Sequence, residues 1–154
     1  MANQIETIHL DEVLKKHSQD MTGKVVAITG TTSGTGFVCA RELAKKGATV
    51  ILLNRESERS EKSYQMLLES VPSGKFDPIA CDLQSFENVR NAMKEIKSKY
   101  EVIDALVNNA GVMALKDEAT EDGYDVQMQT NCLSHFLITR ELFPLLRKSK
   151  EARI

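Results

Sequence analysis

The stretch TGTTSGTG, at residues 29–36, decides how this chain folds. An apolar run, KVVAI at residues 24–28, precedes it, and a helix-like run at residues 37–46 follows it. Apolar runs of this kind form buried parallel strands. A strand, a tight glycine-rich turn and a helix hold the pyrophosphate of a dinucleotide, because the first amides and the dipole of the helix face the anion. The sequence therefore predicts a dinucleotide site at this turn.

The glycines of the turn have separate tasks in this prediction. Gly30 permits the tight turn, Gly34 lets the backbone approach the phosphates, and Gly36 lets the helix pack close to the strand. Glycines among polar residues would also suit an ordinary loop. The residues that we expect to bind the cofactor here are Gly30, Thr32, Ser33, Gly34, Thr35 and Gly36.

Composition narrows the class of protein. The 154 residues correspond to about one domain, and 42% hydrophobic with 27% charged residues is typical of globular proteins. A net charge of −2 gives no electrostatic case for binding nucleic acid or an anionic membrane. No stretch approaches the roughly 20 apolar residues of a membrane span, and the N-terminus lacks a signal core. We therefore expect a cytoplasmic protein.

The cysteines carry no metal or disulfide signature. Cys39, Cys81 and Cys132 are scattered and form no C-x-x-C pair. We expect all of them to be small buried side chains in a reducing compartment, and we expect no metal site.

Strand-like and helix-like segments alternate after an N-terminal extension. Residues 1–22 form this extension, where Ile5, Ile8, Val13 and Leu14 predict a short helix on the exterior. Residues 23–154 predict a Rossmann-like, doubly wound α/β fold, with a parallel sheet between two helical layers. Right-handed crossovers give the strand order 3-2-1-4. The expected strands are 25–29, 49–53, 76–80 and 105–108, and the expected helices are 34–46, 57–70, 85–100 and about 125–149.

Further motifs follow the glycine turn in a fixed order. The turn has the spacing G-x-x-x-G-x-G, and CDL at 81–83, NNAG at 108–111 and TNCLSHF at 130–136 come after it. From residue 23 onward the chain resembles the short-chain dehydrogenase/reductase family, and residues 129–139 most resemble its retinol-dehydrogenase-like and protochlorophyllide-reductase-like branches. The resemblance implies hydride transfer between a nicotinamide and a small carbonyl or alcohol substrate of lipophilic character. It also implies a homo-oligomer formed through the helix at 125–149.

The end of the second strand indicates the cofactor. Members that use NAD usually carry an acidic residue there, which binds the ribose 2′-hydroxyl. Asn54 takes that place without a charge, and the guanidinium of Arg55 suits a 2′-phosphate. The pair therefore predicts NADP (NADPH). Alternatively, Arg55 is a solvated loop residue that pairs with Glu56 or Glu58.

Two more segments reach the same sheet edge. By resemblance, Asp82 accepts from the adenine amino group and the Leu83 backbone lies beside it. Asp82 would also suit the N-cap of the next helix, although Ser85 is the better candidate for that cap. In NNAG, the residues expected to let the adenosine ribose approach are Asn109, Ala110 and Gly111.

Asn108 is expected to stabilise its strand through bonds to neighbouring backbone. Without the resemblance, NNAG is simply a turn. Thr35 departs from the family pattern, which has an aliphatic residue there. Its backbone N–H is retained, so we expect little effect on phosphate binding.

Asn131 is the one catalytic candidate. It interrupts an apolar helix pattern, where asparagine is a mediocre helix former. In the resembling family the matching asparagine holds a water of the proton relay, beside a serine, a tyrosine and a lysine. Alternatively, Asn131 is a satisfied polar residue on a helix flank. His135 is expected to be a packing or surface residue, with no partner for base catalysis or metal binding.

The rest of that catalytic set is missing from these residues. The family donates a proton from the tyrosine of a Tyr-x-x-x-Lys pair, whose lysine lowers the tyrosine pKa. None of Tyr64, Tyr100 and Tyr124 has a lysine four residues later.

Residues 152–154 resemble the first step of a fifth strand, and we expect the N-terminal, cofactor-binding part of a longer enzyme that does not turn over alone. The alternative is a non-catalytic dinucleotide-binding or interaction module. A methyltransferase-like Rossmann protein is disfavoured, because NNAG and Asn131 have no role there.

Overall fold

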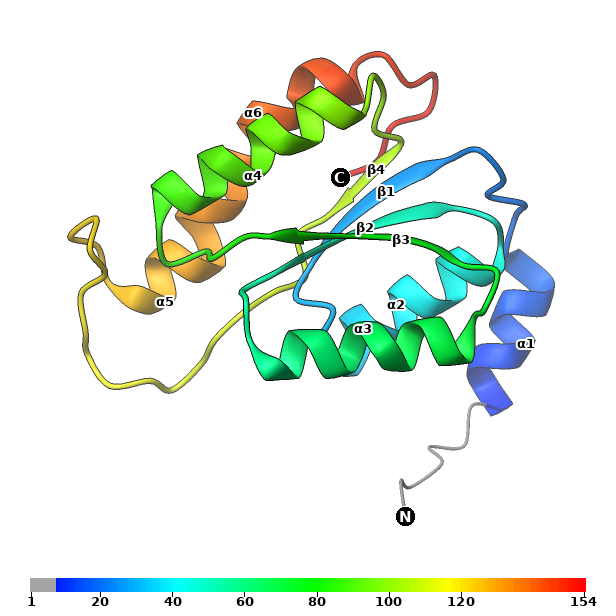
Figure 1. Cartoon of the computed structure of the whole chain (residues 1–154), viewed down its shortest axis with the longest axis horizontal. Helices are drawn as coiled ribbons and strands as arrows, with labels where there is room; N and C mark the ends of the chain where they lie inside the picture. Colours follow the sequence, from blue (N-terminus) through cyan, green and yellow to red (C-terminus); the bar gives the residue numbers. More distant parts are fainter. Residues whose placement is uncertain (1–7) are drawn as a thin grey trace.

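The computed structural model describes residues 8–154 as a three-layer α/β/α arrangement. In Figure 1 the sheet lies between α2 and α3 on one face and α4 and α6 on the other. The sheet is parallel and has the order β3-β2-β1-β4, which confirms the predicted fold and strand order. The strands are β1 (Val25–Thr29), β2 (Thr49–Asn54), β3 (Lys75–Ala80) and β4 (Ala105–Val107). The longer helices are α1 (Ile8–His17), α2 (Gly34–Lys45), α3 (Glu58–Ser70), α4 (Phe86–Lys99) and α6 (Ser134–Leu146).

Both faces of the sheet are buried, which explains why its two central strands are continuous apolar runs. Val26 and Ile28 pack toward α2 and α3, whereas Ala27 between them packs toward α4 and α6. Side chains alternate between the two faces of a strand, so one strand serves both cores. In register, Ile28 lies opposite Leu52 of β2 and Val107 of β4.

Serine side chains and a glycine mark the ends of three helices. The hydroxyls of Ser57 and Ser85 accept backbone N–H groups of α3 and α4, so Ser85 is the cap that we expected. Gly47 follows the end of α2 with a φ of +92°, a conformation that suits glycine. The predicted N-terminal helix is α1, and its expected residue Ile5 lies outside the described part of the chain. None of the described helices is long and apolar enough to cross a membrane.

The expected continuous helix at 125–149 is wrong in detail. It is divided into α5 (Val126–Met128), a π-helical segment η1 (Gln129–Leu133) and α6, and it ends at Leu146. A π-helical turn holds one more residue than an α-helical turn, so side chains after it change face. The irregular turn contains Asn131, the catalytic candidate.

Residues 152–154 begin to pair with the open edge of the sheet, as expected. Arg153 forms a parallel bridge with Ala105 of β4. The Leu106 N–H donates to the Arg153 carbonyl at 3.0 Å, and the Arg153 N–H donates to the Asp104 carbonyl at 3.1 Å.

Candidate functional site

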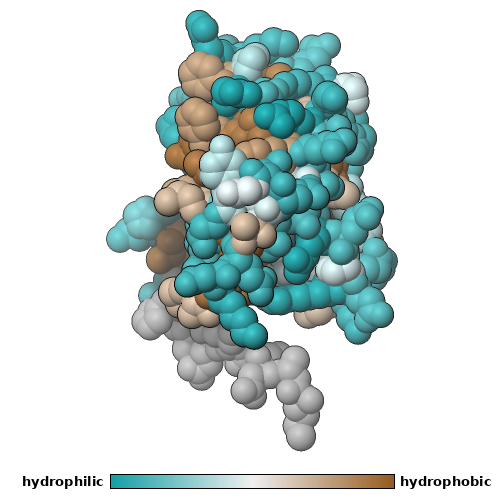
Figure 2. Space-filling view, turned by 90° about the vertical axis from the view of Figure 1, so that its left-hand side faces the viewer, coloured by the Kyte–Doolittle hydropathy of each residue, from teal (hydrophilic) through white to brown (hydrophobic). Residues whose placement is uncertain are grey.

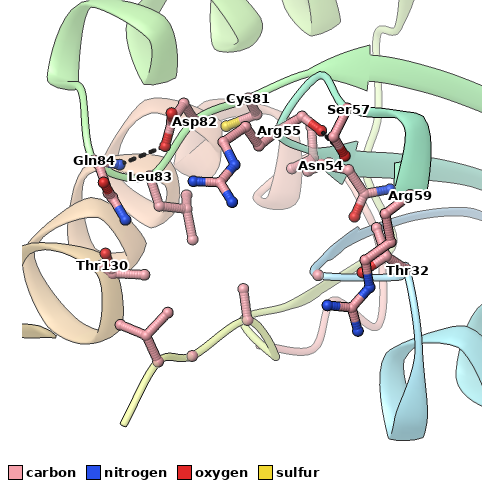
Figure 3. A pocket seen from close by; sticks show the side chains of 15 residues that line it. Thr32, Asn54, Arg55, Ser57, Arg59, Cys81, Asp82, Leu83, Gln84 and Thr130 are labelled. Carbon is pink, nitrogen blue, oxygen red and sulfur yellow. Dashed lines mark hydrogen bonds between the residues drawn. The ribbon is translucent and has the colours of Figure 1, made fainter. Parts of the chain in front are cut away.

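A pocket opens at the carboxyl edge of the sheet, where parallel α/β folds bind ligands (Figure 3). It brings together residues from the glycine turn, the ends of three strands and the π-helical segment. Of the predicted site residues it is lined by Gly30, Thr32, Asn54, Arg55, Asp82, Leu83, Ala110 and Gly111, whereas Ser33, Gly34, Thr35, Gly36, Asn109 and Asn131 do not line it. It also includes residues that we did not predict, namely Leu53, Ser57, Arg59, Cys81, Gln84, Val112 and Thr130.

The glycine turn packs the first turn of α2 tightly against the end of β1. A Cβ on Gly36 would lie 2.2 Å from the carbonyl oxygen of Gly30 and 2.5 Å from the side-chain nitrogen of Asn109. Those distances are too short for any other residue. A Cβ on Gly34 would meet no atom within 4 Å, so this part of the turn faces open space. Thr35 points elsewhere, since it lines a hollow beside Leu14 of α1.

Helix α2 begins without the caps that its neighbours have. Ser33 occupies the N-cap position and makes no side-chain bond to the helix, and the first turn contains no acidic residue. Its hydroxyl instead accepts from the Arg59 guanidinium at 2.5 Å. The first amides of a helix have no partner inside the helix, so those of α2 are available to an anion.

Asn54 ties β2 to the glycine turn. Its side-chain oxygen accepts the Thr31 N–H at 2.8 Å, and its side-chain nitrogen donates to the Thr31 hydroxyl at 2.7 Å. An aspartate there could accept the same amide but could not donate to the hydroxyl. Asn54 thus fixes the shape of the turn while it lines the pocket.

Two guanidinium groups extend into the pocket. Figure 3 shows Arg55 and Arg59 reaching into the space from separate positions. Arg55 is exposed, and within residues 8–154 it forms no ion pair, so the expected alternative of pairing with Glu56 or Glu58 is not found. Arg59 was missed, and its signal was a second arginine four residues later, in the first turn of a helix that starts at the same sheet edge.

The third strand supplies the opposite wall. Asp82 accepts the Gln84 N–H at 2.9 Å, which folds the loop after β3 (dashed in Figure 3). The Leu83 carbonyl accepts the Ser134 hydroxyl at 2.6 Å, so the loop is also fixed to α6. Burial, with a smaller effect of the Asp82 charge, raises the pKa of the Cys81 thiol to about 12, so that this thiol stays protonated.

Asn109 joins the loop after β4 to the glycine turn. Its side-chain nitrogen donates to the carbonyls of Thr29 and Gly30 at 2.9 and 3.0 Å. The expectation that Asn108 makes such backbone bonds is wrong, because the Asn108 side chain is exposed and donates to the Thr139 hydroxyl at 3.1 Å. The two neighbours point in different directions, and Asn109 is the inward one.

Asn131 also binds the loop after β4, through the backbone of Val112. Its side-chain oxygen accepts the Val112 N–H and its side-chain nitrogen donates to the Val112 carbonyl, both at 2.8 Å. Of the two expected settings of His135, packing or surface, the structure shows packing. The side chain is buried, and its ring nitrogens lie 2.9 Å from the Thr29 hydroxyl and 3.1 Å from the Asn131 carbonyl.

The cysteines differ from one another, which corrects the expectation that all are buried. Cys81 is buried, Cys39 is half-buried and Cys132 is exposed, next to Asn131. Cys132 lies in the π-helical segment. Among the described residues, no three histidine, cysteine or acidic side chains gather around a metal position.

The chain is similar in sequence to known oxidoreductases. A model of the short chain dehydrogenase family matches residues 24–154. An uncharacterised oxidoreductase of Schizosaccharomyces pombe is 44% identical over 132 residues, which are 86% of this chain and 39% of that protein. Human retinol dehydrogenase 13 is 36% identical over 132 residues, covering 86% of this chain and 40% of the relative. The chain thus spans about two fifths of the length of these relatives.

Solved structures agree with the fold. The complex of Pseudomonas aeruginosa RhlG with NADP superposes with a TM-score of 0.71 at 30% identity, over 86% of this chain and 52% of that one. A short chain dehydrogenase of Salmonella enterica serovar Typhi gives 0.71 at 28% identity, over 87% of this chain and 57% of the other.

Proposed function

Because the chain belongs to the short-chain dehydrogenase family, we propose that it forms the cofactor-binding part of an NADP-dependent oxidoreductase. The reaction is hydride transfer between the nicotinamide and a carbonyl or alcohol carbon of a small, lipophilic substrate. The likeness to a retinol dehydrogenase supports that substrate class. We further propose that the protein works in the cytoplasm.

The observation that carries the choice of NADP is the pair of guanidinium groups at the end of β2. Arg55 and Arg59 line the pocket, and Asn54 takes the position where an acid would repel a 2′-phosphate. A guanidinium offers several donors in a fixed plane, which match phosphate oxygens. The complex of RhlG with NADP among the similar structures supports the same choice.

The residues present fit a dinucleotide. The uncapped start of α2 would hold the pyrophosphate, Asp82 and Leu83 would flank the adenine, and Ala110 with Gly111 would lie along the ribose. When bound, the cofactor supplies the hydride. Asn131 keeps the Val112 backbone in place beside this pocket, which makes it the candidate for support of the proton relay. No tyrosine of residues 1–154 belongs to a Tyr-x-x-x-Lys pair, so we expect no turnover by this chain alone.

Calorimetric titration of the purified chain with NADPH and with NADH tests the proposal. The Arg55→Ala variant should lose NADPH affinity by roughly 10- to 100-fold, since a hydrogen bond to a charged group is worth about 1.5–3 kcal/mol. Its NADH affinity should change by less than about twofold. Exposed Arg147 at the end of α6, replaced by alanine, is the matched control. Equal losses for both cofactors in Arg55→Ala would contradict the 2′-phosphate assignment.

A second candidate function, an interaction module without catalysis, is favoured by one surface. Met128, Phe136 and Phe143 lie along α5–α6 and are 53%, 68% and 51% exposed. Figure 2, which views the end of the molecule carrying α5, shows apolar surface mainly in the half that holds α4 and α6. Burying such side chains against a second copy would be favourable. Sedimentation that depends on protein concentration, and no longer does so in Phe136→Glu, would support this association, whereas a wild-type monomer at all concentrations would exclude it.

A further inference from the structure

One buried imidazole connects the two sides of the loop that follows β4. His135 lies in the first turn of α6, and its Nε2 is 2.9 Å from the hydroxyl oxygen of Thr29 at the end of β1. Its Nδ1 is 3.1 Å from the backbone carbonyl oxygen of Asn131 in the π-helical segment. The ring therefore bridges the strand that starts the glycine turn and the segment that carries the catalytic candidate.

The neighbours of the Thr29 hydroxyl define which nitrogen of His135 carries the proton. The Thr29 oxygen accepts the N–H groups of Asn109 and Ala110, both at 3.0 Å, and these bonds use both of its lone pairs. Its own proton then goes to the nearer acceptor, Nε2 of His135, rather than to the Val107 carbonyl at 3.4 Å. Nε2 is consequently unprotonated, and Nδ1–H donates to the Asn131 carbonyl.

The surroundings favour this neutral form. Burial lowers the pKa of the His135 imidazole, and the bond to the Asn131 carbonyl opposes that effect only in part. A protonated ring would place an N–H donor against the hydroxyl proton of Thr29, so the whole chain of bonds requires the neutral Nδ1–H tautomer.

Both ends of this chain of bonds lead to the pocket. At one end Thr29 holds the amide of Ala110, which lines the pocket. At the other end Asn131 holds both backbone groups of Val112, which also lines it. We infer that His135 is a positioning residue of the cofactor site, which in its Nδ1–H tautomer keeps the Ala110–Val112 loop in its binding shape. The inference rests on the proposed function for its effect on NADPH.

The tautomer can be measured without any cofactor. In the ¹⁵N-labelled chain, the ring nitrogen shifts of His135 should show a protonated Nδ1 and an unprotonated Nε2 at neutral pH. The His135→Gln variant assigns the signal, and exposed His17 serves as the internal reference. A ring protonated at Nε2, or at both nitrogens, would overturn the inference.

Cofactor affinity supplies the second measurement. His135→Phe should weaken NADPH binding roughly five- to tenfold, the effect of about one lost hydrogen bond. Thr29→Val should weaken it at least as much, because it also removes the acceptor of the Asn109 and Ala110 amides. The loss in the double variant should be smaller than the product of the two single losses, since both variants remove the Thr29–His135 bond. Thr29→Ser should bind like the wild type, and His135→Gln should recover most of the affinity because its amide oxygen can accept the Thr29 proton.

Matched controls separate positioning from general stability. Ile138→Val removes a buried methylene from the same helix without touching these bonds, so it should lower stability but leave NADPH affinity unchanged. Wild-type affinity in a folded His135→Phe variant would overturn the inference. If His135→Phe does not fold, the comparison of Thr29→Val with Thr29→Ser and the tautomer of the wild-type ring decide it.

A different result would contradict the proposed function itself. A wild-type chain that binds neither NADPH nor NADH would contradict the proposed function, and hydrogen exchange at the Asn109 and Ala110 amides would then decide the inference. Faster exchange in His135→Phe than in the wild type, with exchange in His135→Gln close to the wild type, supports it, and unchanged exchange in His135→Phe overturns it.

Discussion

Two adjacent asparagines in the loop after β4 show how much one residue of register decides. Asn109 points inward and binds two carbonyls of the glycine turn, whereas Asn108 points outward to Thr139. Successive side chains of an extended segment face opposite sides, so a shift of one residue exchanges their environments. The two side chains are chemically identical, and only the residue at which β4 ends determines which of them points inward.

Replacing each asparagine by alanine measures this difference. Asn109→Ala should lower the free energy of unfolding by about 1–3 kcal/mol, because two partly buried carbonyls lose their donor. Asn108→Ala should change it by no more than about 0.5 kcal/mol, as expected for an exposed site. Urea unfolding followed by circular dichroism gives both values. Equal losses in the two variants would mean that the assignment of the inward residue is wrong.

The direction of each side chain also decides which residues of the pocket could be predicted. Arg55 and Asp82 follow directly from the ends of strands, so their place at the sheet edge was predictable from the apolar runs before them. Arg59 and Thr130 lie on helices, where the direction of a side chain depends on the rotation of the helix after it packs. His135 was missed for a related reason, since both of its partners are distant in sequence or are backbone atoms.

At the scale of elements, strands and capped helices were predictable and the irregular helix was not. Continuous apolar strands, glycine turns and serine caps are local signals, and the observed bounds of these elements differ from the predicted ones by about one residue. The π-helical segment has no such signal, because the extra residue is accommodated by contacts with other elements. Asn131 bonds to Val112, and the neighbouring Ser134 bonds to Leu83, across the interface between helix and loop.

The first turn of α2 packs so closely on β1 that a larger residue at Gly36 should destabilise the chain. Gly36→Ala should destabilise the chain by about 1–3 kcal/mol or more, since its Cβ would overlap the Gly30 carbonyl. Thr35→Ala is the control, because that side chain is exposed and lies outside the contact. Thermal unfolding of the two variants compares them directly. A Gly36→Ala protein with wild-type stability would show that the turn can move away from β1.

At the scale of the whole molecule, the three cysteines differ in solvent exposure and can therefore be used to test the fold. Cys132 is exposed, Cys39 is half-buried and Cys81 is buried with its pKa raised to about 12. Because the thiolate is the reactive form, Ellman's reagent should modify Cys132 quickly, Cys39 slowly and Cys81 only after unfolding. Cys132→Ser should abolish the fast phase. A fast phase that persists in this variant would contradict the described environment of Cys39 or Cys81.

The uncapped start of α2 has a consequence for how this chain responds to heat. A site that holds an anion only in the folded state couples occupancy to folding, so a ligand present at 100 times its dissociation constant adds about 2.7 kcal/mol of stability. The melting temperature then measures affinity, because dinucleotides can be ranked by the increase in melting temperature that each produces. Gly34 faces open space at the start of α2, so a side chain added there should abolish this increase. Such a ranking needs no substrate and no turnover, so it can compare NADPH with NADH in this chain alone.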